Sequence, residues 1–209
     1  MEHLARDPAP LTRVYHPMAE GMSFKVTVAL RVRRVEKWIR DVKRDYLDNA
    51  SIKCVGLDCE FTNPREGDQL AAVLQLSVVS ENLFLQDGSI RFCGAAIGKD
   101  VEMLIPYGIH ITSAYDLQKI LPNPTNNHIL SLYDLANYLI RTNLEKKKRK
   151  KYKKKDAVQE KEDDELIFGW ANVPLSFEQV RYAVLDARLG FEMARSYWQL
   201  VGYNSHVDR

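Results

Sequence analysis

The feature that most constrains this chain is a short apolar run, KCVGLDCEF at residues 53–61, that contains two acids. Its length and apolar content predict a buried β-strand. Asp58 and Glu60 are two positions apart, so their side chains project from the same face of that strand. Neighbouring carboxylates in a buried strand are costly unless a cation lies between them. The spacing favours a Mg²⁺ or Mn²⁺ site with oxygen ligands, and a solvated strand end is the simpler alternative.

The pattern of the remaining chain predicts mainly strands in the first half and helices after them. The expected strands are 24–30, 53–61, 70–80 and 89–97, and the expected helices are 33–48, 100–108, 114–120, 131–142 and one that begins after Ser176. The strands at 53–61 and 70–80 should form a hairpin. Ser176 with Gln179 fits a capping box, and Gly202 follows the last helical turns. This order predicts an α/β fold with helices packed on a sheet.

Length and composition suit one domain. The chain has 209 residues, of which 45% are hydrophobic. We expect an N-terminal arm at 1–22, a domain at 23–204, and a charged low-complexity insert at 145–165 within it. No apolar run is long enough to cross a membrane, and the first residues lack a secretory layout. The three cysteines have no metal-ligand spacing and are interpreted as reduced, mostly buried thiols.

The formal net charge of +2 hides a strong asymmetry. The run KKKRKKYKKK at 146–155 holds nine of the 30 Lys and Arg residues. Without it, 21 basic residues face 28 acidic ones, a net charge of about −7. Three interpretations of the run stay open: a solvated insert, a nuclear-localisation patch, or a flexible contact to nucleic acid.

Asp100 is the third acid on an apolar framework. It follows the apolar strand RFCGAAI after a Gly-Lys turn and stands where a helix opens. An Asp in that position is commonly a helix N-cap, and such a residue also stands at a strand end, where sites often form.

Tyr182 and Asp186 are four residues apart in VRYAVLDARLGFEMA, so they share one face of a helix. Their near neighbours on that face are apolar, so the Asp carboxylate needs a partner. A metal ion would be one partner, and a structural ion pair with Arg181 or Arg188 is the alternative. Taken with the other acids, the pattern suits two divalent ions held roughly 3.5–4 Å apart on a phosphodiester.

The motifs resemble the DEDD exonucleases of the tyrosine subclass, the ribonuclease D and Werner syndrome exonuclease type, and most closely the plant Werner-like proteins. The matching stretches are VGLDCEF, AAVLQLSV, RFCGAAIGKDVEML, YDLQKI, LYDLANYL and W-ANVPLSFEQVRYAVLDA, spread over roughly residues 24–200. The resemblance implies a ribonuclease H-like mixed sheet flanked by helices. It also implies hydrolysis of DNA or RNA from the 3′ end with two Mg²⁺ or Mn²⁺ ions.

By motif position, the resemblance implies that the two ions are held by Asp58, Glu60, Asp100 and Asp186. It implies that Tyr182 positions the attacking water, with Glu60 as the second group. The terminal base and sugar are expected to rest against Phe61, Leu76 and Ile97, each of which would otherwise be a plain core residue.

The chain departs from this family between its second and third strands. Only ENLFLQDGS at 81–89 links 70–80 to the next strand, where such proteins usually have a further strand and a helix. We therefore expect one edge strand and one helix to be missing, with the metal site still able to assemble. Residues 70–80 would then be an exposed edge, prone to self-association.

Two functions stay open at this point. The first is an active 3′–5′ exonuclease, and the second is a catalytically weak nucleic-acid-binding or regulatory relative. The complete set of acids favours the first, and the shortened sheet favours the second. The basic run predicts a location in the nucleus, with the cytoplasm as a further compartment.

Overall fold

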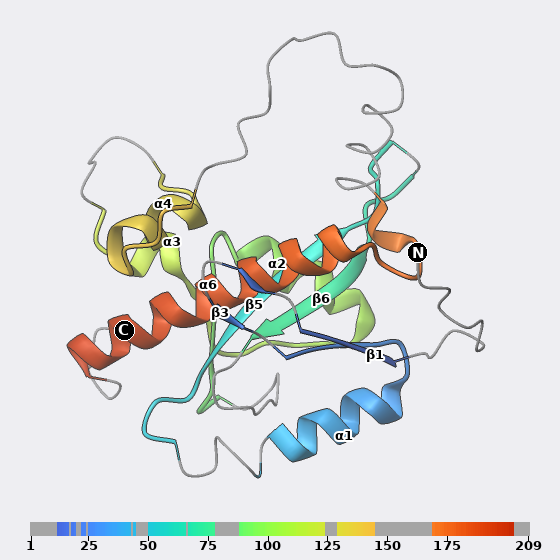
Figure 1. Ribbon diagram of the computed structural model, residues 1–209, viewed down its shortest axis with the longest axis horizontal. Coiled ribbons are helices and arrows are strands. Elements are labelled where there is room, and N and C mark those ends of the chain that lie inside the picture. Colours follow the sequence, from blue (N-terminus) through green and yellow to red (C-terminus); the bar gives the residue numbers. More distant parts are fainter. Residues whose placement is uncertain are drawn as a thin grey trace, which may run out of the picture.

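A computed structural model describes residues 12–16, 18–19, 22–23, 25–42, 44, 50–65, 67–77, 88–123, 129–144 and 169–202. Within them, the central sheet has the strand order β6-β5-β7-β8. Figure 1 labels its neighbouring strands β5 and β6. Its strands are β5 (Cys54–Phe61), β6 (Ala71–Ser77), β7 (Arg91–Gly94) and β8 (Ala114–Asp116). β6 is antiparallel to β5, as the expected hairpin requires, whereas β5, β7 and β8 are parallel. The sheet is therefore mixed.

The two faces of β5 carry different residues because side chains alternate along a strand. One face packs into a core that we call the α6-side core, whose buried residues include Cys54, Cys93, Leu135, Leu189 and Trp198. The other face packs into the α1-side core, whose buried residues include Val55, Leu57, Cys59, Phe92 and Ile97. The sheet thus separates two apolar layers, and Asp58 alternates with Leu57 and Cys59 of the α1-side core.

Three helices build the α6-side layer. Helix α6 (Phe177–Val201) crosses the sheet and begins at the predicted capping box, in which Ser176 and Gln179 bond each other's backbone amides. Gly202 is its C-cap, as expected. The short α3 (Leu117–Ile120) and α4 (Leu132–Leu139) lie beside α6, and Leu117, Leu135 and Ala136 share its core (Figure 1).

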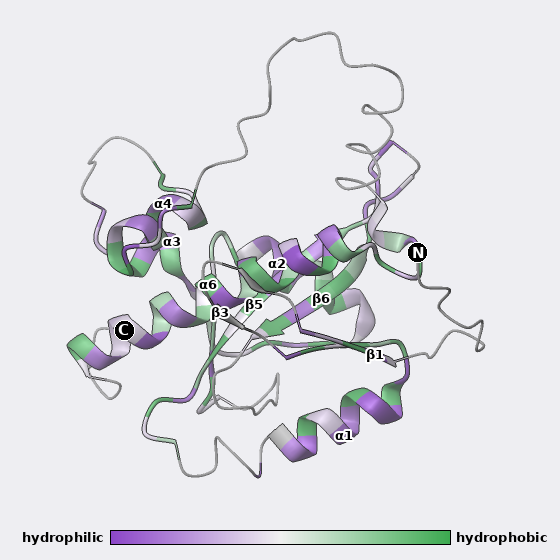
Figure 2. Ribbon diagram, viewed as in Figure 1, coloured by the Kyte–Doolittle hydropathy of each residue, from purple (hydrophilic) through white to green (hydrophobic). Residues whose placement is uncertain are grey.

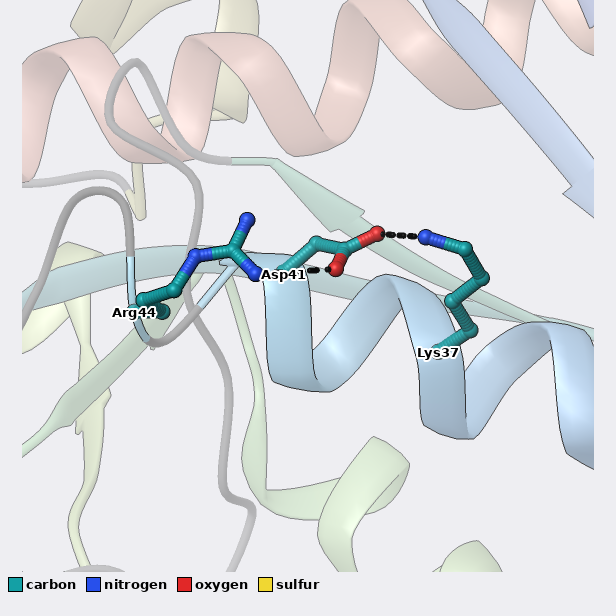
Figure 3. A network of polar contacts seen from close by, with 3 residues as sticks. All are labelled: Lys37, Asp41 and Arg44. Carbon is teal, nitrogen blue, oxygen red and sulfur yellow. Dashed lines mark hydrogen bonds and ion pairs between the residues drawn. The ribbon is translucent and has the colours of Figure 1, made fainter.

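Helix α1 (Val32–Val42) belongs to the opposite layer. Figure 2 shows it as a largely hydrophilic helix, and its partly buried Trp38 and Ile39 pack against the α1-side core. On its exposed side Asp41 pairs with Lys37 and, at 3.5 Å, with Arg44 (Figure 3). Exposed pairs of this kind contribute little to stability. They show that the outer face of α1 is a solvated charged surface.

Short strands precede α1. β1 (Thr12–Tyr15) pairs antiparallel with β4 (Val26–Ala29), and β2 (Met18–Ala19) pairs with β3 (Met22–Ser23). Part of the segment expected as an N-terminal arm is therefore a strand of a two-stranded ribbon. The insert expected at 145–165 and most of the link at 81–89 lie outside the described residues.

One expected helix is partly wrong. Residues 114–120 were expected to be helical throughout, but 114–116 form β8, and α3 begins only at Leu117. The reason is Asp116, whose carboxylate accepts from the Gln118 backbone amide at 3.0 Å and so caps α3 at its first turn. The helix expected at 100–108 is α2 (Gly98–Leu104), followed by the 3₁₀ turn η2 (Ile105–Tyr107).

Two smaller expectations can also be compared with the structure. The three cysteines are free and buried, as their sequence context predicted. Among the described residues, none of the helices combines the length and apolar character that a membrane crossing requires.

Candidate metal and nuclease site

Helix α6 lies directly on the sheet at two glycines. A Cβ at Gly56 would overlap the Ala187 carbonyl oxygen and lie 2.7 Å from the Phe191 backbone nitrogen. A Cβ at Gly190 would lie 3.1 Å from the Cys93 carbonyl oxygen. No side chain fits between helix and sheet there, so the two backbones approach closely. Asp58 and Glu60 follow Gly56 on the same face of β5, which turns both acids toward α6.

Asp58 lies among the other acids of the site. Burial first, and then the charges of Asp186, Asp100 and Glu60, raise its pKa well above the ordinary value. With its amide oriented to donate, the buried Gln75 reaches Asp58 Oδ2 at 3.1 Å and the Asp58 carbonyl oxygen at 3.2 Å. The carboxylate is half-buried and faces other acids, so the alternative of a solvated strand end does not hold.

Glu60 shares this environment. Burial, followed by the charges of Asp186 and Asp100, raises its pKa to about 8. Acids from β5, α2 and α6 thus affect one another's ionisation although they are far apart in the sequence. We call Asp58, Glu60, Asp100 and Asp186 the carboxylate cluster.

Asp100 enters the cluster from α2. The helix begins at Gly98 and its N-cap is Ile97, so the interpretation of Asp100 as the N-cap is wrong. The residue lies inside the first turn and is 6% exposed. Its pKa is raised to about 7 by burial, against the opposing charge of Lys99. The buried acid is therefore held at the end of β7 by the helix that follows it.

Asp186 is bound by two tyrosines. The Tyr133 hydroxyl donates to Asp186 Oδ1 at 2.9 Å, and Tyr182 also hydrogen-bonds the carboxylate. Burial raises the pKa of Asp186 to about 6, and both hydrogen bonds act in the lowering direction. The alternative of an ion pair is not what the arginines form, because Arg181 pairs with Glu178 and Arg188 with Glu192.

Tyr182 is the most accessible residue at this site. It is 36% exposed, and its ring lies 6.0 Å from that of the buried Trp170 in the 3₁₀ turn η3 (Gly169–Ala171). Burial, followed by the charges of Asp186 and Glu60, raises the pKa of its hydroxyl. The hydroxyl is thus protonated at neutral pH and can donate a hydrogen bond near both acids.

The residues expected to line a substrate pocket differ in position. Leu76 and Phe61 are partly buried against the α1-side core, and Ile97 belongs to that core with an exposure of 2%. Phe61 also contacts a cation, because the Lys99 ammonium lies 4.8 Å from its ring centroid. The same ammonium donates a hydrogen bond to Gln69 Oε1 at 2.9 Å. Their contact with a nucleotide stays a prediction.

The donor set suits a hard divalent cation, because it consists of four carboxylates with tyrosyl and amide groups around them. Among the described residues, no three His, Cys, Asp or Glu side chains are arranged to hold one ion. The chemistry of the donor set nevertheless fits Mg²⁺ or Mn²⁺.

Comparison with solved structures finds chains that align with this one. The EXO domain of Nibbler from Aedes aegypti aligns with a TM-score of 0.54 at 16% identity, covering 81% of this chain and 85% of that one. NrnC from Brucella melitensis gives 0.49 at 18% identity, over 76% and 80% of the two chains. The catalytic core of RRP6 from Trypanosoma brucei gives 0.47 at 16% identity, over 95% and 64%. No family model and no curated protein matches the sequence.

The chain has a ribonuclease H-like fold. The mixed sheet, the flanking helices and the alignment with the Nibbler EXO domain confirm that expectation. The finer assignment to the tyrosine subclass and to plant Werner-like proteins has no support from a sequence family and stays a prediction. Sequence reasoning also missed Tyr133, since nothing local links it to an acid 53 positions later.

Proposed function

We propose that this protein is a metal-dependent 3′–5′ exonuclease that hydrolyses terminal phosphodiester bonds of DNA or RNA. The observation that carries the proposal is the carboxylate cluster: four acids from β5, α2 and α6 converge at one end of the sheet, and burial raises the pKa of each. Such an arrangement is costly in a folded protein, and a bound divalent cation would offset the cost.

The four acids would hold two ions. When bound, the ions would supply acidity to a water molecule and stabilise the charge on the departing 3′ oxygen. The Tyr182 hydroxyl, beside Glu60 and partly exposed, would orient that water in line with the phosphorus. Phe61 would support the terminal nucleotide, with Lys99 above its ring as a cation near the phosphates.

The test is degradation of end-labelled oligonucleotides, single-stranded DNA and RNA and a recessed 3′ end, with Mn²⁺ or with EDTA. We expect stepwise shortening from the 3′ end in Mn²⁺ only. Asp58→Asn should reduce the rate by at least about 100-fold, since several kcal/mol of transition-state stabilisation is lost. The matched control is Asp41→Asn, the same change on the exposed side of α1, which should keep the wild-type rate (Figure 3).

Shortening that persists in EDTA, or equally in Asp58→Asn, would contradict the proposal. Binding of oligonucleotides without shortening would support the second candidate, a catalytically weak nucleic-acid-binding relative. The observation that favours this candidate is the arrangement of the acids, no three of which, in the described residues, are positioned for one ion.

We also propose a nuclear location, with cytoplasmic protein as well, on the basis of KKKRKKYKKK at 146–155. The run lies outside the described residues, so the proposal rests on its charge alone. Replacing its Lys and Arg residues by Gln in a fluorescent fusion should move the protein out of the nucleus. An unchanged distribution would leave the run as a solvated insert or an electrostatic arm for nucleic acid.

A further inference from the structure

Tyr133 is a polar residue that joins the cluster from an element that contributes none of its four acids. It lies in the first turn of α4, whereas the four acids lie on β5, α2 and α6. Its hydroxyl donates to Asp186 Oδ1 at 2.9 Å in a partly buried setting, across 53 positions of sequence. A hydrogen bond to a carboxylate under such conditions is among the stronger ones in proteins.

The position of Tyr133 is fixed by its surroundings. Ser131 and Asp134 form a capping box at the start of α4, in which Asp134 Oδ2 accepts from the Ser131 amide at 3.0 Å. Just before it, the Gln118 side chain donates to the Leu130 carbonyl oxygen at 2.9 Å and ties α4 to α3. Leu135 and Ala136 are buried in the α6-side core. The tyrosine is thus held rigidly against α6.

We infer that Tyr133 is a positioning residue for Asp186, which fixes one carboxylate oxygen so that the other is available to a divalent cation. An Asp side chain has two rotatable bonds, and a hydrogen bond to Oδ1 restricts both. Because Tyr133 can hold Asp186 by itself, the Tyr182 hydroxyl, which here also hydrogen-bonds this carboxylate, is able to turn to the attacking water. The inference rests on the proposed function, because it assumes that Asp186 is a ligand.

Tyr133→Phe removes the hydroxyl alone, and α4 offers a matched control in Tyr138→Phe, because Tyr138 is 53% exposed on the same helix. The primary measurement is calorimetric titration of each full-length variant with Mn²⁺ alone, without substrate. We expect Tyr133→Phe to weaken Mn²⁺ binding by roughly 10-fold or more, the usual effect of losing a group that orients a ligand. Tyr138→Phe should bind as the wild type does.

Two further measurements separate positioning from a general structural role. Excess Mn²⁺ should restore the exonuclease kcat of Tyr133→Phe, because the lost property is affinity. In the background of Asp186→Asn, the change Tyr133→Phe should have no further effect on Mn²⁺ binding, since the tyrosine acts through Asp186.

The outcomes distinguish the two proposals. Wild-type Mn²⁺ affinity in Tyr133→Phe, whatever its thermal stability, overturns the positioning role alone. A further loss of affinity in the double variant overturns it as well, because Tyr133 would then act by another route. If the wild-type chain takes up no Mn²⁺, the proposed function fails and the positioning role fails with it.

Discussion

At the scale of single residues, the cluster combines four acids whose negative charges repel one another. Glu60, with a pKa of about 8, and Asp100, with one of about 7, are raised chiefly by burial. Asp186 stays lower, at about 6, and two tyrosyl hydroxyls bind it. A raised pKa means that the folded chain binds the proton of that carboxyl group more tightly than the unfolded chain does. The metal-free protein therefore tolerates the cluster by keeping protons on it.

The first prediction concerns pH. Raised carboxyl pKa values mean that the folded chain binds more protons than the unfolded one between pH of about 4 and 8, so its stability falls as pH rises through that window. We expect the free energy of unfolding in EDTA to be lower at pH 9 than at pH 5 by at least about 1 kcal/mol.

Asp58→Asn should reduce that dependence and stabilise the metal-free protein at pH 8, because the buried amide has no charge that folding must desolvate or neutralise. Urea unfolding in EDTA at pH 5, 7 and 9 measures both effects, with Asp41→Asn as the control. A wild-type stability that rises steadily from pH 5 to pH 9 would show that the acids are not buried together.

At the scale of elements, the site depends on how closely α6 approaches the sheet. Gly56 and Gly190 permit the contact: a Cβ at Gly190 would lie 3.8 Å from the Gly56 Cα. Asp58 is two residues beyond Gly56, and Asp186 is one helical turn before Gly190. The backbone contact therefore sets the separation between acids that belong to different elements.

Gly56→Ala should disrupt this arrangement. The new Cβ would overlap the backbone of α6 at Ala187, so strand and helix must separate. We expect a loss of stability of about 1–3 kcal/mol and weaker Mn²⁺ binding. Gly98→Ala is the matched control, because nothing lies within 4 Å of a Cβ there. Thermal melting and Mn²⁺ calorimetry measure both effects; equal behaviour of the two variants would refute the account of the contact.

Local sequence patterns point to the acids of the cluster, whereas they do not point to the residues that support them. Strand alternation places Asp58 and Glu60 on one face, and helical periodicity pairs Tyr182 with Asp186. Tyr133 could not be found, because its partner is set by the packing of α4 on α6. Strand β8 was missed because three residues are too few to show a period. They form a strand because they pair with β7, which a local pattern does not reveal.

At the scale of the molecule, β6 lies at one end of the strand order among the described residues. The notable shortness of the link at 81–89 is the reason to expect no further strand beside it. A sheet edge presents unpaired backbone groups that another copy can bind, and the half-buried strand here contains Val73 and Leu74.

We therefore expect self-association through β6. Light scattering during size-exclusion chromatography should show an average mass that rises with protein concentration. Salt should not abolish this rise, because the expected contact would be made by backbone hydrogen bonds. A chain that stays monomeric at all concentrations and melts cooperatively would contradict this expectation.

The central claim is that acids from three elements bind divalent cations together. The most direct test is anomalous diffraction from crystals of the full chain soaked in Mn²⁺. The account predicts two anomalous peaks between Asp58, Glu60, Asp100 and Asp186, roughly 3.5–4 Å apart, and none there in Asp58→Asn. Peaks elsewhere, or an empty cluster at saturating Mn²⁺, would contradict it.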